Sequence, residues 1–391
     1  MIYWIWLQSA VGYGYKYIKP LLERYKTAEK VYHAPFNDLE FSGLFSKSAL
    51  SKLKNKDLDA ARKVLNECIK RKISIVTIGD EKYPPLLNEI PNPPIVLYTK
   101  GNLELLDCRP GVCIVGPREV SDFGKKAAFS LGARLAAGGI IIVSGGAKGS
   151  DTAAHKGALV VGGNTVCVLA VGIEDDYLQL NKELRAEIAK AGLLVSEFQP
   201  GSVVRKGTFS IRNRLMSGLT LGTVVIEADE KSGALITANY AAEQNRDVFV
   251  IPGNPTLPHY KGSNLLLQDG AKALLDAKDI FFEYLADYPH KIYLEKAYKE
   301  KIKFEAEPEA NKKQPAAAPA EKEKEEFIKK NITSPLSNSA KMVYNQLDKQ
   351  VFFADEIVVP ELSASQFLAA ITELEIFGYI QALPGGRYTL K

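Results

Sequence analysis

The chain has 391 residues, of which 46% are hydrophobic and 25% are charged. This balance is typical of a soluble globular protein and excludes a fully disordered chain, and the length suggests about two to three domains. Fifty basic and 46 acidic residues leave a net charge of +4, which is too small by itself to indicate a nucleic-acid partner.

The sequence also argues against membrane, secreted and metal-binding proteins. The apolar start, Met1–Leu7, is far shorter than the roughly 18 residues of a membrane helix and lacks the basic region and cleavage site of a signal peptide. The four cysteines form no CxxC pair and predict reduced thiols in a cytoplasmic protein. The four histidines lie far apart in the sequence, so we expect no metal site, and we expect no cofactor.

Residues 1–70 predict a small domain of short helices. Apolar residues recur at helical spacing in Leu21–Tyr25 and Leu58–Ile69. Ahead of them, Gly12-Tyr13-Gly14 lies between two short helical stretches. This pattern is typical of helix–hairpin–helix units, whose backbone amides contact DNA phosphates. The alternative is a tight turn in a small helical module.

From Ile73 onward, short runs rich in β-branched residues alternate with helical segments. The runs predict strands at residues 73–78, 95–98, 112–115, 140–143, 165–169, 193–196, 223–226 and 248–251. Helices are expected at residues 123–137, 152–160 and 233–244. Strands that alternate with helices predict an α/β fold with a doubly wound, mostly parallel sheet and helices on both faces.

The last hundred residues predict a linker and a second small domain. Residues 296–330 are rich in Lys and Glu and include a Pro/Ala tract, so this stretch is too charged to bury a core. The remainder predicts a helix, a short helix or strand, a helix over Ser363–Phe377 and a hairpin at Gly385-Gly386, which is the winged-helix pattern. The expected divisions are residues 1–70, 71–285, 286–334 and 335–391.

The residues that follow the predicted strands predict a phosphate-binding edge. The carboxyl ends of parallel strands meet at one edge of the sheet, beside helix N-termini that favour anions. Glycines there let backbone amides approach a ligand, and basic residues add charge. The residues concerned are Arg118, Ser144, Gly145, Lys148, Lys231, Ser232 and Gly233. The alternative is that the glycines only serve tight turns.

Standard nucleotide-binding and catalytic motifs are missing from this edge. Gly145–Asp151 lacks the order of a Walker A loop, and no GxGxxG occurs. No Ser-His-Asp order or carboxylate pair stands out. Asp151 follows the glycine loop directly, so we expect it to cap the next helix rather than to act as a general base.

The most basic stretch is a predicted loop, Arg205–Arg214. Cations that hold phosphates beside an aromatic ring on which a base can stack are typical of single-stranded nucleic-acid binding. The residues expected to contact DNA here are Lys206, Phe209, Arg212, Asn213 and Arg214. The alternative is a solvated basic loop with Phe209 packed into the core.

Together, these loops resemble the DNA-processing protein A family (DprA, also called Smf), nearly continuously from about Tyr83 to Ala271. The motifs that carry the resemblance are Tyr83–Leu87, Val112–Arg118, Val143–Asp151 with His155, Ser196-Glu197, Pro200-Gly201, Phe209–Arg214, Glu227-Ala228, Ser232–Thr237, Gln244–Arg246 and Val250–Gly253. The resemblance implies a Rossmann-like core that binds single-stranded DNA without sequence preference. It also implies protection of incoming DNA during natural transformation, help in loading the RecA recombinase, and a homodimer. We expect a non-enzymatic protein without a membrane partner.

The resemblance assigns roles to individual residues. Arg118 matches an arginine that contacts phosphate, and Lys206 and Phe209 match the lysine and the aromatic residue that contact backbone and base. The positions that line the family's anion pocket are matched by Ser144, Gly145 and Lys148.

The chain departs from the family pattern at several positions. Pro117 stands where threonine or a similar residue is usual, and Lys148 replaces an arginine, trading a forked guanidinium for a point charge. Ser210 and Leu178 replace prolines. These departures predict weaker DNA binding than in a typical member.

The terminal modules resemble the family's sterile-alpha-motif-like or helix–hairpin–helix N-terminus and its winged helix. The expected recognition helix, Ser363–Phe377, contains no lysine or arginine. Because phosphate neutralisation supplies much of the affinity for DNA, we expect this helix to contact a protein rather than DNA.

Two other functions remain open at this stage. The first is a Rossmann-type hydrolase of nucleotides or nucleoside monophosphates that uses Glu227 as its acid or base. Gly222–Glu227 matches the required Gly-Thr-x-x-Glu only partly, with one residue too many, and the companion Pro-Gly-Gly stretch is missing. The second is a scaffold that recruits a recombinase without using the basic stretch.

Overall fold

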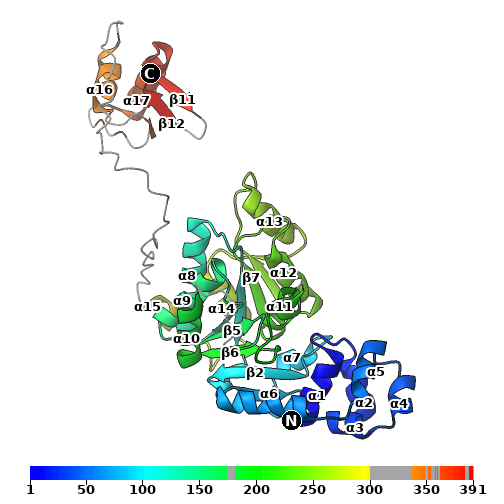
Figure 1. Cartoon of the computed structure of the whole chain (residues 1–391). Helices are drawn as coiled ribbons and strands as arrows, with labels where there is room; N and C mark the ends of the chain where they lie inside the picture. The colour runs from blue at the N-terminus through cyan, green and yellow to red at the C-terminus, as the bar shows by residue number, and fades with distance from the viewer. Residues whose placement is uncertain are drawn as a thin grey trace, which may run out of the picture. The chain divides into compact units, whose positions relative to one another are not determined.

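The computed structural model describes residues 1–173, 181–205, 207–299, 336–347, 351–353, 362–383 and 387–390, together with residues 357 and 359. The chain forms two compact units, Met1–Ala306 and Glu307–Lys391 (Figure 1). The first unit contains the expected doubly wound sheet and the N-terminal helices.

A nine-stranded sheet forms the centre of the first unit. Its strands are β1 (Ser74–Thr77), β2 (Val96–Gly101), β3 (Gly111–Val115), β4 (Ile141–Ser144), β5 (Thr165–Leu169), β6 (Leu193–Ser196), β7 (Gly222–Val225), β8 (Asp247–Val250) and β9 (Lys272–Ala273). They lie in the order β1-β2-β6-β5-β4-β3-β7-β8-β9. Only β2 runs antiparallel to its neighbours β1 and β6; the other pairs are parallel.

The predicted Rossmann-like α/β fold is confirmed, because the chain winds outward twice from β3. It proceeds through β4, β5 and β6 on one side and then returns to β7, β8 and β9 on the other. Every strand expected from the sequence is present. The edge strand β9 was missed because its two residues are exposed and carry no hydrophobic run that could mark a strand.

Alternate residues of the strands face opposite layers of helices, as the two-residue period of a strand requires. The helices are α7 (Pro85–Glu89), α8 (Asp122–Ala137), α9 (Ser150–Val160), α10 (Lys182–Ala191), α11 (Thr208–Gly218), α12 (Gly233–Glu243), α13 (Lys261–Gln268), α14 (Ala277–Tyr284) and α15 (Leu294–Lys299), with short 3-10 turns at Leu103–Leu106 and Pro258–Tyr260. Val112 and Ile114 pack with α8, α9 and α14. Cys113 and Val115 pack with α7, α11 and α12 on the other face (Figure 1).

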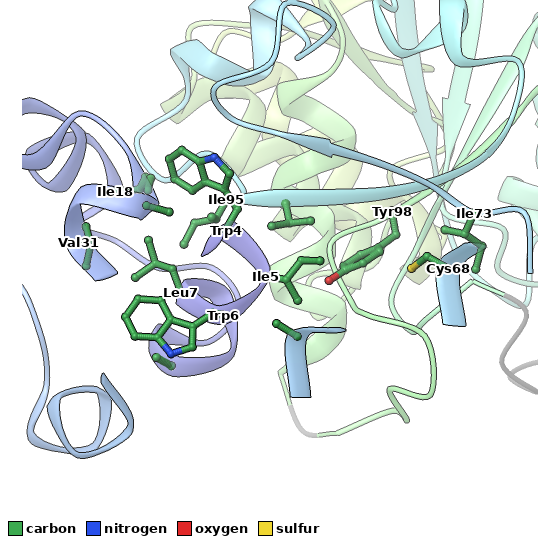
Figure 2. Close-up of a cluster of buried hydrophobic side chains, with 14 of the residues drawn as sticks. Trp4, Ile5, Trp6, Leu7, Ile18, Val31, Cys68, Ile73, Ile95 and Tyr98 are labelled. Atoms are coloured by element: carbon green, nitrogen blue, oxygen red, sulfur yellow. The ribbon is translucent and has the colours of Figure 1, made fainter. Parts of the chain in front are cut away.

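The N-terminal helices share a hydrophobic core with the β1–β2 end of the sheet. They are α1 (Ile2–Val11), α2 (Ile18–Tyr25), α3 (Ala28–His33), α4 (Phe36–Phe41), α5 (Lys47–Leu53) and α6 (Asp59–Lys70). Ile5 and Leu7 of α1 are fully buried in one cluster with Ile95 and Tyr98 of the sheet region (Figure 2). Gln8 adds polar contacts, since its amide donates to the carbonyls of Val96 (3.3 Å) and Glu197 (3.2 Å) and accepts from the hydroxyl of Tyr98.

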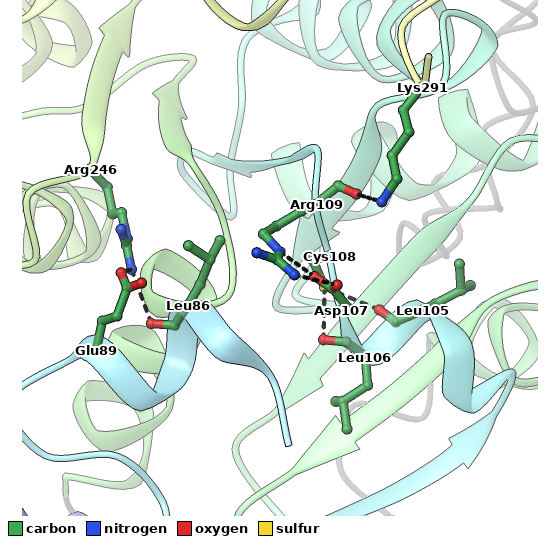
Figure 3. Close-up of polar contacts among 9 residues, drawn as sticks. All are labelled: Leu86, Glu89, Leu105, Leu106, Asp107, Cys108, Arg109, Arg246 and Lys291. Atoms are coloured by element: carbon green, nitrogen blue, oxygen red, sulfur yellow. Dashed lines mark hydrogen bonds and ion pairs between the residues drawn. The ribbon is translucent and has the colours of Figure 1, made fainter. Parts of the chain in front are cut away.

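Polar side chains hold in place the segments that precede β3 and β8. Arg109, which precedes β3, donates two hydrogen bonds to Asp107 at 2.7 and 2.8 Å and so holds the pKa of this carboxyl below its usual range. Lys291 donates to the carbonyl of Arg109 at 2.8 Å. Arg246, which precedes β8, donates to Glu89 of α7 at 2.8 Å (Figure 3). At the amino ends of β3 and β8, these charged side chains therefore have structural roles.

The second unit contains two described helices and a small antiparallel sheet. The helices are α16 (Asn338–Gln346) and α17 (Ala364–Ile376), and the strands β10 (Val351–Phe353), β11 (Ile380–Leu383) and β12 (Arg387–Leu390) lie in the order β10-β12-β11. Ser363 and Gln366 form a capping box that begins α17. The expected hairpin at Gly385-Gly386 and most of the predicted linker lie outside the described residues, so the winged-helix assignment stays a prediction.

Three findings concern the function classes considered from the sequence. No helix in the described ranges is both long and apolar enough to cross a bilayer. The four cysteines are buried and unpaired, and burial raises the pKa of each thiol. Among the described side chains, no group of three or more His, Cys, Asp or Glu could hold a metal ion.

Because α1 shares its core with the sheet, Ile5→Ala should destabilise the whole first unit, by about 2–5 kcal/mol. The chain's only two tryptophans, Trp4 and Trp6, are in α1, so their fluorescence reports the N-terminal helices, while far-UV circular dichroism is dominated by the rest. In a urea titration, the unfolding midpoints from tryptophan fluorescence and from circular dichroism should shift together to a lower urea concentration.

The control is Ile69→Ala on α6, where the side chain is 67% exposed and the change should be within about 0.5 kcal/mol. A shift of the tryptophan transition alone would show that the N-terminal helices unfold independently.

Candidate nucleic-acid interface

A pocket of about 370 Å³ lies at the carboxyl ends of the central strands. It is found where the chain order reverses between β3 and β7, which is the usual ligand position in doubly wound sheets. Its lining comes from the end of β3, the β4–α9 loop, α11 and the first turns of α12. The lining residues are Val115, Gly116, Pro117, Arg118, Ala147, Asp151, Phe209, Arg212, Asn213, Met216, Ser232, Gly233, Ala234 and Thr237.

The predicted basic loop is largely a helix, and this prediction was wrong. Helix α11 begins at Thr208, after Gly207 in the left-handed conformation (φ 93°). Arg212, Asn213 and Arg214 are 5%, 8% and 1% exposed. The guanidinium groups of Arg212 and Arg214 are bonded to carbonyls and a carboxylate near the strand ends, and Asn213 accepts from Arg212. They are therefore not part of a solvated loop.

Arg212 braces the ends of two strands. Its Nη1 donates to the carbonyls of Gly145 (2.6 Å) and Val168 (2.5 Å), and its Nε donates to Asn213 at 3.1 Å. A Cβ at position 145 would lie 2.2 Å from Nη1 of Arg212. Glycine is required there because the guanidinium occupies the space of a side chain.

Arg214 is taken up by a buried ion pair. Its Nη2 lies 2.5 Å from a carboxylate oxygen of Glu197, and both side chains are 2% exposed. The other carboxylate oxygen accepts the backbone N–H of Gly14 at 2.9 Å. Through Glu197, Arg214 joins α11 to the residue after β6 and to Gly14, which lies in the hairpin between α1 and α2. The side chain of Arg214 is too buried to contact a phosphate.

Arg118 and Phe209 form the accessible polar–aromatic pair of the pocket. Arg118 is exposed and Phe209 is half-buried. The guanidinium carbon of Arg118 lies 5.1 Å from the centre of the Phe209 ring, within the range of a cation–π contact. A cation and an aromatic face therefore meet at one wall of the pocket.

The other predicted site residues are placed differently. Ser232 and Gly233 line the pocket at the start of α12, where the Ser232 side chain caps the helix. Lys148 and Lys231 are exposed on the adjoining loops but are not among the lining residues. Ser144 is buried and donates to the carbonyl of Ile114 at 2.7 Å. Lys206 lies outside the described residues.

Asp151 organises the glycine loop instead of capping a helix. The N-cap of α9 is Gly149, so the predicted capping role was wrong. The Asp151 carboxylate accepts the backbone N–H groups of Gly145 (3.1 Å) and Ala147 (3.2 Å). Burial raises the pKa of Asp151, and the nearby Arg212 and the two amides oppose that shift.

Glu227 is also committed to structural contacts. Its carboxylate accepts the backbone N–H of Ser121 at 3.1 Å, the hydroxyl of Ser121 and the hydroxyl of Tyr260 at 3.0 Å. The Glu227 side chain thus holds Ser121, the N-cap residue of α8, and it is absent from the pocket lining. This geometry does not favour the hydrolase alternative, which needs Glu227 at the ligand.

Several lining residues were not singled out from the sequence. Gly116 and Ala147 lie in strand-end loops considered from the sequence but were not assigned to the site, and Met216 is apolar and carried no chemical signal. Thr237 could have been found, because it follows Gly233 by one helical turn and so shares its face of α12.

The region of the chain that carries this pocket matches a known protein family. The family model described as DNA recombination-mediator protein A matches residues 74–285, which is more than half of the chain. The chain belongs to the DNA recombination-mediator protein A family. The resemblance to DprA and Smf proteins is thereby confirmed.

Individual relatives cover both the whole chain and its core. Protein Smf of Synechocystis sp. is 32% identical over 99% of this chain and 98% of its own length. An X-ray structure of DprA from Streptococcus pneumoniae superposes with a TM-score of 0.64 at 34% identity, covering 72% of this chain and 98% of that one. A structure of DprA from Helicobacter pylori, described for its single-stranded DNA binding mode, gives a TM-score of 0.50 at 31% identity over 55% and 97%.

His155, part of the motif that resembles the family, is a buried neutral side chain of α9. The hydroxyl of Thr165 donates to the carbonyl of Ile142 (2.9 Å) and lies 2.7 Å from Nδ1 of His155. Thr165 therefore accepts from Nδ1–H, and Nε2 carries the lone pair, without a partner among the described atoms. Burial, with a smaller effect of Arg212, lowers the pKa of His155 to about 3.

The Arg212 brace predicts that Gly145→Ala destabilises the fold by about 1–3 kcal/mol, because the new methyl group displaces the guanidinium. Gly233→Ala is the matched control at the same edge, since no atom lies within 4 Å of its Cβ position. Denaturant unfolding should separate the two variants. Equal midpoints would contradict the brace.

Because His155 is buried and neutral, we expect the free energy of unfolding to depend on pH in the acid range. Its pKa is lower in the folded chain than the usual value of about 6.5, so the unfolded chain takes up the proton first and stability falls as the pH drops from about 6.5 towards 3. Between pH 7 and 5.5, where most carboxylates stay ionised, His155→Gln should lose about 1 kcal/mol less than the unmodified chain. Parallel pH profiles of unfolding free energy would contradict a neutral buried His155.

Proposed function

We propose that this chain binds single-stranded DNA without sequence preference at the pocket edge, in the processing of incoming DNA during natural transformation. The Arg118–Phe209 pair at the pocket wall is the observation that supports this most strongly. Membership of the DNA recombination-mediator protein A family and the DNA-binding relative from H. pylori support it further.

In this proposal, the phosphate is held by charge and the base by an aromatic face. The N-terminus of α12 at Ser232 and Gly233 carries a partial positive charge of about half a unit and borders the pocket together with Arg118. Lys148 and Lys231 add positive charge from the adjoining loops. Phe209 supplies a stacking surface, and phosphates and ring faces are common to every nucleotide.

Arg212, Asn213 and Arg214 support the interface from beneath. Arg212 and Asn213 line the pocket but are nearly buried, and Arg214 is enclosed with Glu197. We therefore assign these residues the role of holding α11, and with it Phe209, in place. Arg118, Phe209 and the exposed lysines make the direct contacts in this proposal.

Pro117 bears on the expected strength of binding. Its carbonyl accepts the backbone N–H (3.3 Å) and hydroxyl (3.4 Å) of Ser150, which starts α9. Proline has no N–H of its own to offer a phosphate. Together with the lysine at position 148, this supports weaker phosphate binding than a threonine and an arginine would provide.

Further parts of the proposal concern partners. A RecA recombinase that receives the DNA and a homodimer of this chain follow from the family resemblance, and both would operate in the cytoplasm. The four divisions at residues 1–70, 71–285, 286–334 and 335–391 are proposed as functional modules. The lack of lysine and arginine in α17 supports a protein-contacting role for the C-terminal module.

The test is a fluorescence-anisotropy titration with labelled oligo-dT at two salt concentrations. Arg118→Gln should weaken binding and reduce the slope of log K against log salt by about 0.7, the value of one phosphate contact on a single strand. Phe209→Leu should cost about 1–3 kcal/mol of binding energy with little change in slope.

Arg62→Gln on α6 removes the same charge at a position that is 61% exposed and away from the pocket lining, and should leave both quantities close to those of the unmodified chain. Unchanged affinity and slope in Arg118→Gln would refute the proposed site, and tighter binding to duplex than to the single strand would refute the proposed ligand.

A further inference from the structure

The glycine hairpin at Gly12–Tyr17 lies against the segment that leads into α11. The hydroxyl of Tyr13 is 3.2 Å from Oγ of Ser202 and accepts the backbone N–H of Gln199 at 3.4 Å. The rings of Tyr13 and Phe198 lie 4.6 Å apart. The hairpin thus contacts residues 198–202, which precede α11, the helix that carries Phe209.

The hairpin also touches α11 itself. A Cβ on Gly14 would lie 3.5 Å from the side chain of Ile211, so the backbone of the hairpin at Gly14 lies close to this helix. The ion pair of Glu197 with Arg214 fixes the same contact, because Glu197 accepts the N–H of Gly14. The hairpin therefore has a defined position beside the helix that carries Phe209.

The amides of the two hairpin glycines are already bonded within the protein. The N–H of Gly12 donates to the carbonyl of Gln8 at 2.8 Å, and that of Gly14 donates to Glu197. The side chains that follow are accessible instead. Lys16 is exposed and Tyr17 is 51% exposed.

The segment next to the hairpin adds a further exposed cation and two exposed apolar side chains. Val203 and Val204 are 64% and 38% exposed, and Arg205 is exposed. Arg205 follows Ser202 by three residues, and Ser202 contacts Tyr13, so no more than about 11 Å of extended chain separates Arg205 from this contact. The charge of Arg205 is therefore near the hairpin.

The distance between the hairpin and the pocket suits a single strand. Residues 203–209 connect Ser202, at the hairpin, to Phe209, at the pocket, and an extended chain of this length reaches no more than about 25 Å. Single-stranded DNA-binding folds occupy about 4–16 nucleotides. One strand of ordinary site size can therefore cover both places.

We propose that Lys16, Tyr17 and Arg205 form a second contact area that extends the single-strand path from the pocket across the N-terminal hairpin. Lys16 and Arg205 hold phosphates, and Tyr17 offers a ring on which a base stacks. This inference rests on the proposed function, because it names a continuation of the same DNA path. It gives the N-terminal module a role in setting the length of strand that is bound.

The experiment compares two strand lengths. Lys16→Gln/Tyr17→Ser, both changes at exposed positions, is titrated with oligo-dT of about 5 and about 20 nucleotides beside the unmodified chain and Arg118→Gln. We expect the double variant to bind the long strand about 10-fold more weakly, as the loss of one stacked base and one phosphate contact implies, and the short strand with unchanged affinity. Arg118→Gln should weaken binding of both lengths.

A matched control removes the same chemistry elsewhere in the N-terminal helices. Lys30→Gln/Phe41→Ser takes one cation from α3 and one exposed aromatic ring from α4, and Phe41 is 83% exposed. It should bind both strands as the unmodified chain does, and circular dichroism should show all variants folded. An equal loss in this control would reduce the effect to general charge and overturn the second contact area.

The remaining outcomes separate the two proposals. If Lys16→Gln/Tyr17→Ser binds both lengths normally while Arg118→Gln is weakened, the pocket stands and the second contact area is wrong. If Arg118→Gln also binds both lengths normally, the proposed site fails, and the second contact area fails with it.

Discussion

The buried ion pair between Arg214 and Glu197 is the contact on which the arrangement of the first unit depends. It joins α11 to the end of β6, and through the N–H of Gly14 it also holds the N-terminal hairpin. Removing one partner of such a pair typically costs about 3–5 kcal/mol, because the other charge is left buried. Nε and Nη1 of Arg214 find no partner among the described atoms, so this contact provides a defined position more than a large gain in stability.

The position of α11 decides which positive charges meet the solvent. With Arg214 turned towards Glu197 and Arg212 bonded to the carbonyls of Gly145 and Val168, these two cations compensate groups inside the protein. Phe209, at the start of the same helix, is left beside the exposed Arg118. The interface is thus built in two layers, in which buried cations hold the strand ends and exposed groups remain for a ligand.

The carboxylates near this edge have structural roles as well. Asp151 accepts hydrogen bonds from two amides of the glycine loop, and Glu227 accepts from Ser121, the N-cap residue of α8, and from Tyr260. A general acid or base must reach the reacting atoms of a substrate, and Glu227 is bonded to Ser121 and Tyr260 and is not among the lining residues of the pocket. This arrangement agrees with the proposed binding role better than with the hydrolase alternative.

The sequence by itself determined the strands, the main helices around them and the edge at which the pocket lies. These features depend on local hydrophobic periodicity and on the rule that parallel strands end together. Only the tertiary structure decided which cations are accessible. Arg118, Arg212 and Arg214 are equivalent as letters, but burial depends on partners such as Gly14 and Glu197, which are 183 residues apart. A local sequence pattern does not show such distant pairing. The segment around Arg212 was therefore predicted to be a DNA-contacting loop, although it is a buried part of α11. The contact of the hairpin with α11 could likewise be seen only in the folded chain.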